Sequence, residues 1–231
     1  MVDIADQVVI AILTRAPSAA GKTRLFQELG RPVDRELLAA LLLDTIDAIE
    51  SVRAPRVVFV APASAVDEVR AIVPREVDVL AQGDGDLGAR MRRAFDDLFA
   101  RGARGVVLVG SDLPGLSAAV VRGAVETLDA RAGCVVLGPA EDGGYYLIGA
   151  TRTPAVLLAG IEWSTADVLA STEARARQSG LETVRLPIGR DIDSLADLAT
   201  VPPGAVRTQQ WLRRHAPDLS HEMTRHAQRD G

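Results

Sequence analysis

Two basic residues follow a glycine shortly after the first apolar stretch of the chain. Residues 8–13 are rich in β-branched side chains and predict a buried strand, which is followed by a turn-rich segment and then by Gly21, Lys22 and Arg24. Glycine allows a ligand to approach the backbone closely, and the N-terminus of the helix predicted over residues 22–29 favours anions. The segment therefore predicts a binding site for the phosphates of a nucleotide.

The same segment nearly fits a P-loop, but two residues argue against that motif. Ala16 stands where the first glycine belongs, and it adds a Cβ where tight curvature is needed. Pro17 has no N–H group to offer to a phosphate. The remaining alternative is a basic first turn that is simply solvated, although such a turn opposes the helix dipole.

Acidic residues follow two later stretches of the chain. Asp112 comes shortly after the most apolar predicted strand, residues 105–109, and a carboxylate is a hard oxygen ligand suited to Mg²⁺. In an extended segment, Asp191 and Asp193 point the same way while Ile192 points into the core. We therefore predict a site for Mg²⁺ or Mn²⁺ at Asp112 and Asp193, with Asp191 as the alternative second ligand. A helix-capping role for Asp193 is the non-metal alternative.

Two glycine-containing loops offer further candidate sites. Residues 82–88 contain a G-x-G-x-x-G pattern, but Asp84 and Asp86 would face a pyrophosphate with two negative charges, which disfavours dinucleotide binding. A loop that lies against a nucleoside is favoured, with a plain turn as the alternative. Residues 141–146, Glu-Asp-Gly-Gly-Tyr-Tyr, predict either a pocket for a second substrate or a tight turn with packed tyrosines.

The elements that must position these residues alternate between strands and helices. Strands are predicted at residues 8–13, 56–60, 77–80, 105–109, 135–137, 145–148 and 183–186. Helices are predicted at residues 22–29, 35–52, 65–72, 87–100, 117–130, 165–178, 194–199 and 205–215. This alternation predicts a three-layer α/β/α fold with a mostly parallel sheet. Residues 145–148 are expected to be antiparallel, because the turn before them is too short for a helical crossover.

The polar clusters coincide with the ends of the predicted strands. In parallel sheets, ligands bind beyond the carboxyl ends of the strands. The clusters fall there, at residues 14–22, 82–86, 111–112 and 141–142. The coincidence predicts one active site.

Length, net charge, cysteine count and apolar runs exclude several classes of protein. A chain of 231 residues predicts one domain, residues 1–217, followed by a flexible tail at 218–231. The net charge of -5 argues against a general nucleic-acid-binding protein. The single cysteine, Cys134, excludes an internal disulfide and is expected to be buried. No signal-type or bilayer-length apolar run is present, which predicts a cytoplasmic protein without a membrane partner.

Several other residues are expected to have only structural roles. Ser117 and Ser194 are predicted helix N-caps, Trp163 is expected to pack at the start of a helix, and Asp197 is expected to be solvated. Three histidines near the C-terminus are expected on the surface, namely His215, His221 and His226.

Taken together, five strings resemble a known family. They are Ala16-Pro17…Gly21-Lys22-Thr23-Arg24-Leu25, Gln82-Gly83…Asp86-Leu87-Gly88…Arg90-Met91, Gly110-Ser111-Asp112-Leu113-Pro114, Gly138-Pro139…Asp142-Gly143-Gly144-Tyr145-Tyr146 and Trp163-Ser164-Thr165. The chain resembles the DUF2064 transferases, also called radical-SAM/selenodomain-associated transferase 1 or arsenosugar-biosynthesis-type glycosyltransferases. The resemblance runs in order from about residue 8 to about residue 200.

The resemblance implies a fold and a superfamily. The family has the GT-A nucleotide-diphospho-sugar transferase fold. Its Lys-Thr-Arg-Leu segment is similar to that of phospholactate guanylyltransferases, which share a superfamily with the molybdenum-cofactor guanylyltransferases. One departure concerns residues 18–21, Ser-Ala-Ala-Gly, where family members usually carry Pro-Gly-x-Val/Ala. We therefore expect a differently shaped loop.

The resemblance also implies roles for individual residues. Lys22, Arg24 and Asp112 would be catalytic, and Asp112 and Asp193 would bind the metal. The implied nucleotide site comprises Thr14, Ala16, Pro17, Gly21, Lys22, Arg24, Gln82, Gly83, Leu87, Gly88 and Met91. The implied acceptor site comprises Asp142, Gly143, Gly144 and Tyr145.

The expected function is magnesium-dependent transfer from an NTP or a nucleotide sugar. The two acids and the basic first loop favour nucleotidyl transfer onto a small phosphorylated or phosphonate acceptor. Glycosyl transfer from a nucleoside-diphosphate sugar is the first alternative, and a P-loop-type kinase or a non-catalytic nucleotide-binding protein is the next. The expected partners are a nucleotide donor and a small-molecule acceptor, without nucleic acid, for a monomer or homodimer.

Overall fold

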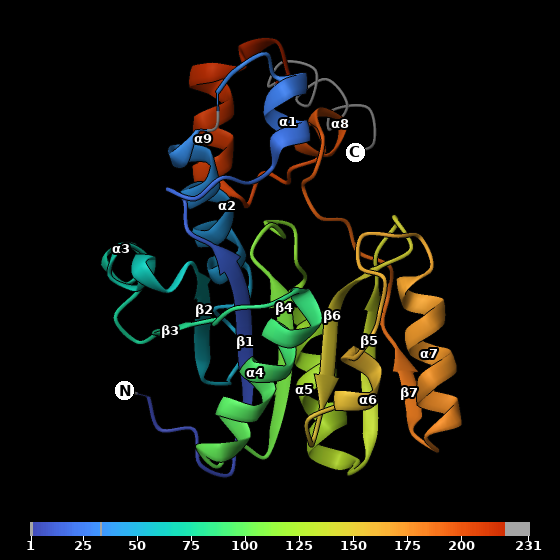
Figure 1. The fold of residues 1–231 in the computed structure, drawn as a ribbon. Helices are drawn as coiled ribbons and strands as arrows, with labels where there is room; N and C mark the ends of the chain where they lie inside the picture. The colour runs from blue at the N-terminus through green and yellow to red at the C-terminus, as the bar shows by residue number, and fades with distance from the viewer. Residues whose placement is uncertain (1, 33, 220–231) are drawn as a thin grey trace.

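A mixed sheet runs through the centre of the computed structural model, which describes residues 2–32 and 34–219 (Figure 1). Its strands are β1 (Val8–Arg15), β2 (Arg56–Ala61), β3 (Asp78–Ala81), β4 (Gly105–Gly110), β5 (Cys134–Pro139), β6 (Tyr145–Ala150) and β7 (Glu182–Arg185). They lie in the order β3-β2-β1-β4-β6-β5-β7. Strand β6 runs antiparallel to both neighbours, whereas the other paired strands are parallel. The predicted mostly parallel sheet is confirmed, and β4, the strand predicted to be the most apolar, lies in its middle.

Helices fill most of the intervals between strands. They are α1 (Thr23–Glu28), α2 (Arg35–Ala48), the short 3-10 helix η1 (Ala63–Ala65), α3 (Val66–Ile72), α4 (Leu87–Ala100), α5 (Ala118–Ala130), α6 (Ala155–Leu158), α7 (Val168–Gln178), α8 (Leu195–Leu198) and α9 (Val206–His215). Helix α6 was not predicted, and α7 begins at Val168 rather than at residue 165. The chain turns before α7, where Ser164 has a φ of +66° that is incompatible with a helix.

Both faces of the sheet are covered, which explains the nearly continuous apolar runs of its strands. In β1, Val8 and Ile10 pack on the side of α2, α3 and α5, whereas Val9 and Ala11 pack on the side of α4, α6 and α7. The predicted three-layer α/β/α architecture is therefore confirmed.

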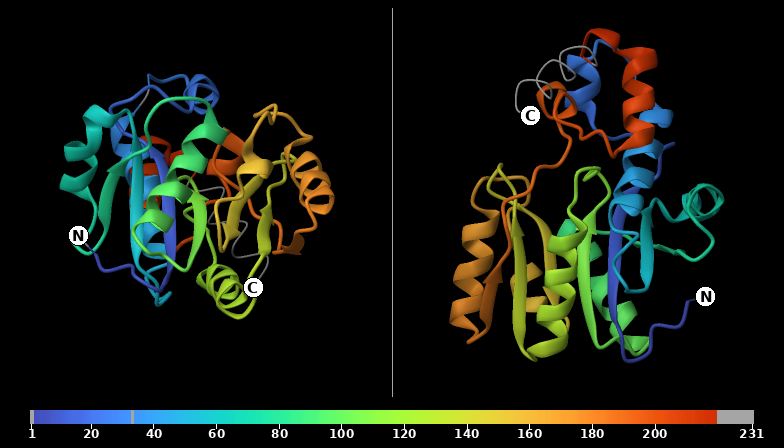
Figure 2. Two further views of the ribbon diagram at one scale, coloured as in Figure 1. Left: turned by 60° about the horizontal axis from the view of Figure 1, so that its bottom comes forward. Right: turned by 180° about the vertical axis from the view of Figure 1, so that it is seen from behind.

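A group of helices lies above the carboxyl ends of the central strands, at the top of Figure 1. We call α1, α8, α9 and the first half of α2 the helical cap. The cap has its own apolar cluster, in which Trp211 is fully buried. Helix α2 joins the cap to the sheet, because its Leu37 and Leu41 belong to this cluster while Leu42 and Ile46 pack on the sheet. Figure 2 shows the same arrangement from behind.

The structure settles several minor expectations. Cys134 is buried, as predicted. Ser117 is at the N-cap of α5 but its side chain accepts no capping hydrogen bond, whereas Ser194 caps α8 in a capping box with Asp197. The expectation that Asp197 is simply solvated is wrong, because its carboxylate accepts from the N–H groups of Asp193 and Ser194 at 3.2 and 2.8 Å.

The end of the chain is only partly described. His215 is half-buried and lies 5.1 Å from Trp211 between ring centroids, so the expectation of a surface residue is wrong for it. His221, His226 and most of the predicted tail lie outside the described residues. No helix in the described part of the chain is long and apolar enough to cross a membrane.

Candidate active site

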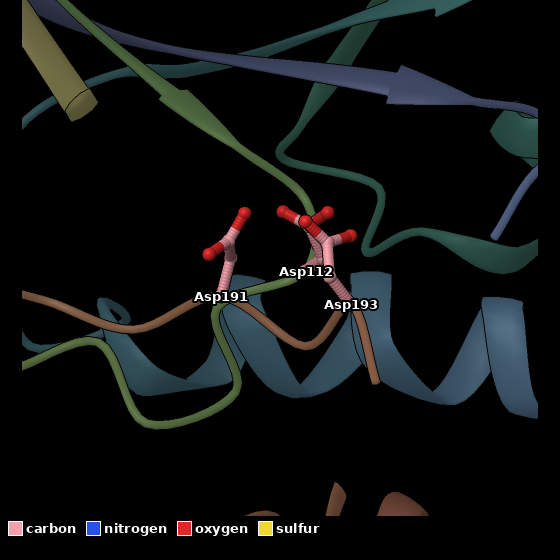
Figure 3. A group of neighbouring side chains, drawn as sticks. All are labelled: Asp112, Asp191 and Asp193. Carbon is pink, nitrogen blue, oxygen red and sulfur yellow. The ribbon is translucent and has the colours of Figure 1, made fainter. Parts of the chain in front are cut away.

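Three carboxylates from two distant segments meet at the carboxyl edge of the sheet. Asp112 follows β4, and Asp191 and Asp193 lie on the connection from β7 to α8. The N–H group of Ile192 donates to the Asp112 carbonyl at 3.0 Å, which pins the two segments together. One carboxylate oxygen from each aspartate lies within 4.8 Å of the others, and Figure 3 shows the three side chains directed toward the same space.

The buried position of Ile192 explains the alternation that was expected from the sequence. Ile192 is 3% exposed and belongs to the apolar cluster of the helical cap. Because neighbouring residues of an extended segment point in opposite directions, Asp191 and Asp193 both face Asp112. The sequence left open which of the two would join Asp112, and the structure brings both to it.

The three carboxylates repel one another. Burial, together with the negative charges of Asp112 and Asp193, raises the pKa of Asp191 to about 7. Three carboxylates that gather hard oxygen donors in one place are a ligand set suited to Mg²⁺ or Mn²⁺. The residues present therefore fit the metal that the sequence predicted.

Lys22 reaches the same cluster from the first loop. It precedes α1 with a φ of +50°, and its Nζ donates to Asp112 Oδ2 and to Asp193 Oδ1. Burial opposes the charged form of Lys22, but the two carboxylates outweigh it and raise the pKa of the ammonium group. Lys22 thus stays positively charged next to the candidate metal ligands.

Other residues of the first loop lie further from the cluster. Arg24 is 75% exposed and pairs with Glu28 along α1 at 2.9 Å. Ala16 and Pro17 are buried, and Ala16 donates its N–H to the Ala61 carbonyl at 2.8 Å. Gly21 has room for a Cβ, since the nearest side-chain atom would be 3.5 Å away. In this loop, Lys22 is the predicted site residue that the structure brings to the carboxylates.

The loop at residues 82–88, which was predicted to lie against a nucleoside, is held by contacts with neighbouring parts of the protein. The buried amide of Gln82 donates to the carbonyls of Thr14 and Phe59 at 2.6 and 2.9 Å. Gly83 has a φ of +75°, and a Cβ there would overlap the guanidinium of Arg93. Gln82 therefore ties the ends of β1 and β2 to this loop with its N–H groups.

A cavity of about 310 Å³ opens beside the carboxylates. Predicted site residues that line it are Leu87, Met91, Asp112, Asp142, Gly144, Tyr145 and Asp193. Predicted site residues that do not line it are Thr14, Ala16, Pro17, Gly21, Lys22, Arg24, Gln82, Gly83, Gly88 and Gly143. The structure thus brings three of the four predicted acceptor residues and the carboxylate cluster to one cavity.

The loop at residues 141–144, which was predicted to contact the acceptor and is called the acceptor loop below, packs against the start of α7. The Gly144 N–H donates to Asp142 Oδ1 at 2.9 Å, and the Gly143 carbonyl accepts from Leu169 at 2.9 Å. Gly143 has a φ of +88°, and a Cβ there would overlap the backbone of Ala166. Glycine is therefore required for this loop to form one wall of the cavity.

The two tyrosines after this loop have different roles. Tyr146 is packed between Gly138 and Gly189, where a Cβ would come within 2.5 and 2.6 Å of its ring, and its hydroxyl donates to the Pro187 carbonyl at 3.0 Å. Tyr145 packs on the opposite side of the sheet, where burial raises the pKa of its hydroxyl. Both rings contribute to the cavity wall. The expected packing of the tyrosines is confirmed, whereas a pocket for a second substrate stays a prediction.

The segment before α7 contributes to the site, which its sequence did not indicate. Trp163, Ser164 and Thr165 line the cavity, although Trp163 was expected only to pack at a helix start. The amino-acid composition could have drawn attention to this segment, because large aromatic residues with a polar group are few in the chain, which has two tryptophans and two tyrosines. Three of these four rings, those of Tyr145, Tyr146 and Trp163, line this one cavity.

A comparison with protein families gives one match. The family is described as "Uncharacterized protein conserved in bacteria (DUF2064)", and it matches residues 45–165. This chain belongs to the DUF2064 family. The matched range contains Asp112 and Asp142, whereas Lys22 and Asp193 lie outside it. The predicted membership is confirmed, and no curated protein matches this DUF2064 protein.

Solved structures resemble nearly the whole chain. A putative nucleotide-diphospho-sugar transferase from Desulfovibrio desulfuricans G20 is 28% identical, with a TM-score of 0.78 over 96% of this chain and 95% of that one. A nucleotidyl transferase from Methanothermobacter thermautotroptrophicus is 18% identical, with a TM-score of 0.59 over 87% and 99%. A CMP:2-keto-3-deoxy-manno-octonic acid synthetase in complex with CTP is 14% identical, with a TM-score of 0.56 over 89% and 100%.

These structural similarities test the predicted fold and the predicted enzyme class. The similarity in fold to the structure from D. desulfuricans and to the synthetase confirms the predicted nucleotide-diphospho-sugar transferase fold. The relative from D. desulfuricans is similar over almost the full length of both chains, and with it the predicted enzyme class, transferase, is confirmed.

Proposed function

We propose that this DUF2064 protein catalyses divalent-metal-dependent transfer from a nucleotide donor, either an NTP or a nucleotide sugar. The observation that carries the proposal is the meeting of Asp112, Asp191 and Asp193 with Lys22. It occurs beyond the carboxyl ends of β1 and β4, between which the strand order reverses. Open α/β sheets bind their ligands at such a point.

Each charged residue has a role in this proposal. Asp112 and Asp193 hold the metal with Asp191, and the bound ion supplies positive charge to the donor's phosphates. Lys22 stabilises the negative charge that develops on the leaving phosphate oxygens. Arg24, which is exposed and pairs with Glu28 along α1, is proposed to bind the donor's phosphates as a second positive charge.

Nucleotidyl transfer is the first form of the reaction. An oxygen of the acceptor attacks the α-phosphorus of an NTP, and pyrophosphate leaves. The acceptor then lies in the cavity against Asp142, Gly144 and Tyr145, which are contiguous with the metal cluster. The folds of the nucleotidyl transferase and the synthetase support this form.

Glycosyl transfer is a second candidate, favoured by the lining of the cavity. Aromatic and carboxylate side chains suit the ring and hydroxyl groups of a sugar. In this form, the acceptor attacks the anomeric carbon and a nucleoside diphosphate leaves. The printed description of the relative from D. desulfuricans supports this form.

Metal-dependent nucleotide binding tests the proposal. Thermal unfolding is measured with Mg²⁺ or Mn²⁺ and a panel of NTPs and nucleotide sugars. A ligand at 100 times its Kd should stabilise the protein by about 2.7 kcal/mol. We expect Asp193→Asn to abolish the metal-dependent part of this stabilisation, whereas a P-loop kinase would be insensitive to it.

Asp129→Asn is the matched control, because Asp129 pairs with Arg104 away from the cluster. No stabilisation by any nucleotide would overturn the proposal. Preference for nucleotide sugars over NTPs would overturn the nucleotidyl form, and the reverse preference would overturn the glycosyl form. Nucleotide binding without turnover of any acceptor would indicate a sensor instead of an enzyme.

A further inference from the structure

The cavity beside the metal cluster is strongly acidic. Four carboxylates line it, those of Asp112, Asp142, Asp191 and Asp193, and its lining in the described part of the chain includes no lysine or arginine. The nearest basic residues already have partners. Lys22 is held by Asp112 and Asp193, and Arg190 pairs with Glu141, with Arg190 Nε 2.9 Å from the Glu141 carboxylate. Asp142 lies outside the three carboxylates proposed to hold the metal, so an anionic group placed against it would meet a like charge without a basic partner among the described lining residues.

One wall of the cavity is aromatic and apolar. The ring of Trp163 meets that of Tyr145 edge to face, with centroids 6.4 Å apart and an interplanar angle of 82°. Leu87 and Met91 of α4 line the same cavity, and Leu87 is 47% exposed although it is a large apolar side chain. Exposed apolar surface next to aromatic rings is typical of a ligand-binding wall.

The orientation of Trp163 decides which part of its ring a ligand can touch. A Cβ on Gly88 would lie 2.9 Å from Trp163 Cζ2 and 3.0 Å from its Nε1, so this edge of the ring faces α4. The Nε1 atom is buried and has no hydrogen-bond partner among the residues that the structure describes. The part of the half-buried ring that faces the cavity is therefore hydrocarbon and not the polar N–H.

We propose that Trp163 determines specificity by stacking on an uncharged, hydroxyl-bearing ring of the substrate, and that the cavity rejects a substrate with an anionic group on that ring. This inference rests on the proposed function, because it concerns the part of the substrate beyond its phosphates. The aromatic face packs against the C–H groups of such a ring, and the carboxylate of Asp142, which is not one of the proposed metal ligands, accepts from its hydroxyls. A phosphorylated acceptor fits this cavity only when the rest of the molecule is neutral.

A matched pair of ligands tests the charge requirement on the unaltered protein. Glucose 1-phosphate and glucuronic acid 1-phosphate share a ring and a phosphate, and the second carries one additional carboxylate. In the presence of Mn²⁺, titration calorimetry should give a Kd at least about tenfold lower for glucose 1-phosphate. Equal affinities, or tighter binding of the glucuronic acid derivative, would overturn the charge requirement.

Acrylamide quenching of fluorescence tests the contact with Trp163 directly. The chain has two tryptophans, and Trp211 is 0% exposed, so quenching reports mainly on half-buried Trp163. Bound glucose 1-phosphate should reduce the quenching constant about twofold, by analogy with the burial of exposed ring surface on binding. Unchanged quenching at a ligand concentration that calorimetry shows to be saturating would overturn the contact.

Substitutions provide a second, independent readout. Trp163→Ala should raise the Kd for glucose 1-phosphate about tenfold, and Trp163→Phe should restore most of the affinity because it keeps an aromatic face. Val156→Ala is the control, since Val156 is 50% exposed and does not line this cavity. An unchanged Kd in folded Trp163→Ala would overturn the role of Trp163.

Failure of this inference is distinguishable from failure of the proposed function. Thermal stabilisation by nucleotides and metal is measured on the same samples. Nucleotide stabilisation without binding of glucose 1-phosphate would overturn the inference and leave the proposed function standing. Absence of nucleotide stabilisation would overturn the proposed function.

Discussion

Asp191 has the carboxylate whose acidity is most changed by its surroundings. Its pKa in the folded, metal-free protein is about 7, raised by burial and by the charges of Asp112 and Asp193. In the unfolded chain, an aspartate titrates near pH 4. Between these values the folded state binds a proton that the unfolded state has released, so stability falls as the pH rises through this window.

Asp191→Asn should therefore change the pH dependence of stability. The asparagine cannot ionise, so the variant should gain stability relative to the unaltered protein as the pH rises from 5 to 8. The gain is expected to be on the order of 1–2 kcal/mol. Urea unfolding in EDTA at both pH values measures it. Asp67→Asn is the control because its side chain is 95% exposed, and a gain of equal size there would contradict the explanation.

At the scale of elements, the acceptor loop depends on a glycine for two separable reasons. Gly143 has a positive φ, and its Cα lies against the backbone of Ala166. Gly133, before β5, also has a positive φ, of +79°, but no atom would lie within 4 Å of a Cβ there. Comparing Gly133 with Gly143 therefore separates the cost of a left-handed backbone from the cost of steric overlap.

We expect Gly133→Ala to cost about 1 kcal/mol, which is the strain of a left-handed conformation in a residue with a Cβ. Gly143→Ala should cost about 3 kcal/mol, because overlap with Ala166 is added to the same strain. Urea unfolding followed by circular dichroism measures both. An equal loss of unfolding free energy in the two variants would contradict the role assigned to steric overlap, because it would show that the loop can move away from α7 at no energetic cost.

At the scale of the whole molecule, Asp44 in the second half of α2 holds α9 of the helical cap. Its side chain is 1% exposed, and it accepts from the N–H groups of Arg207 and Thr208 at the start of α9, at 3.2 and 2.7 Å. Asp47, one turn along α2, also pairs with Arg207 but is 45% exposed. The two aspartates share one partner and differ in burial.

Asp44→Ala should lower the free energy of unfolding by about 3 kcal/mol, because it leaves buried N–H groups of α9 without an acceptor. Asp47→Ala should cost less than about 1 kcal/mol, as is usual for a solvent-exposed ion pair. Urea unfolding again measures both. A loss for Asp47→Ala as large as that for Asp44→Ala would contradict the role assigned to burial.

Much of the fold was predictable because its signals are local. Helix α4 has the predicted bounds, since a glycine-rich loop precedes it and its apolar residues recur at helical spacing. The direction of β6 followed from the short turn before it. The pairing of Asp191 and Asp193 on one side of Ile192 followed from the alternation of an extended chain.

The tertiary structure alone decided which distant segments meet. The position of β6 between β4 and β5, and the helical cap built from both ends of the described chain, depend on contacts between residues far apart in sequence. Arg24 was expected at the phosphates, but its side chain lies along α1 with Glu28, a choice that sequence spacing does not determine. Trp163 was assigned to packing because its place in the cavity arises only where α4, β6 and the segment before α7 converge. Residue types and periodicity thus determined the elements and the carboxylate ligands, whereas the packing of those elements decided the shape and charge of the cavity that they enclose.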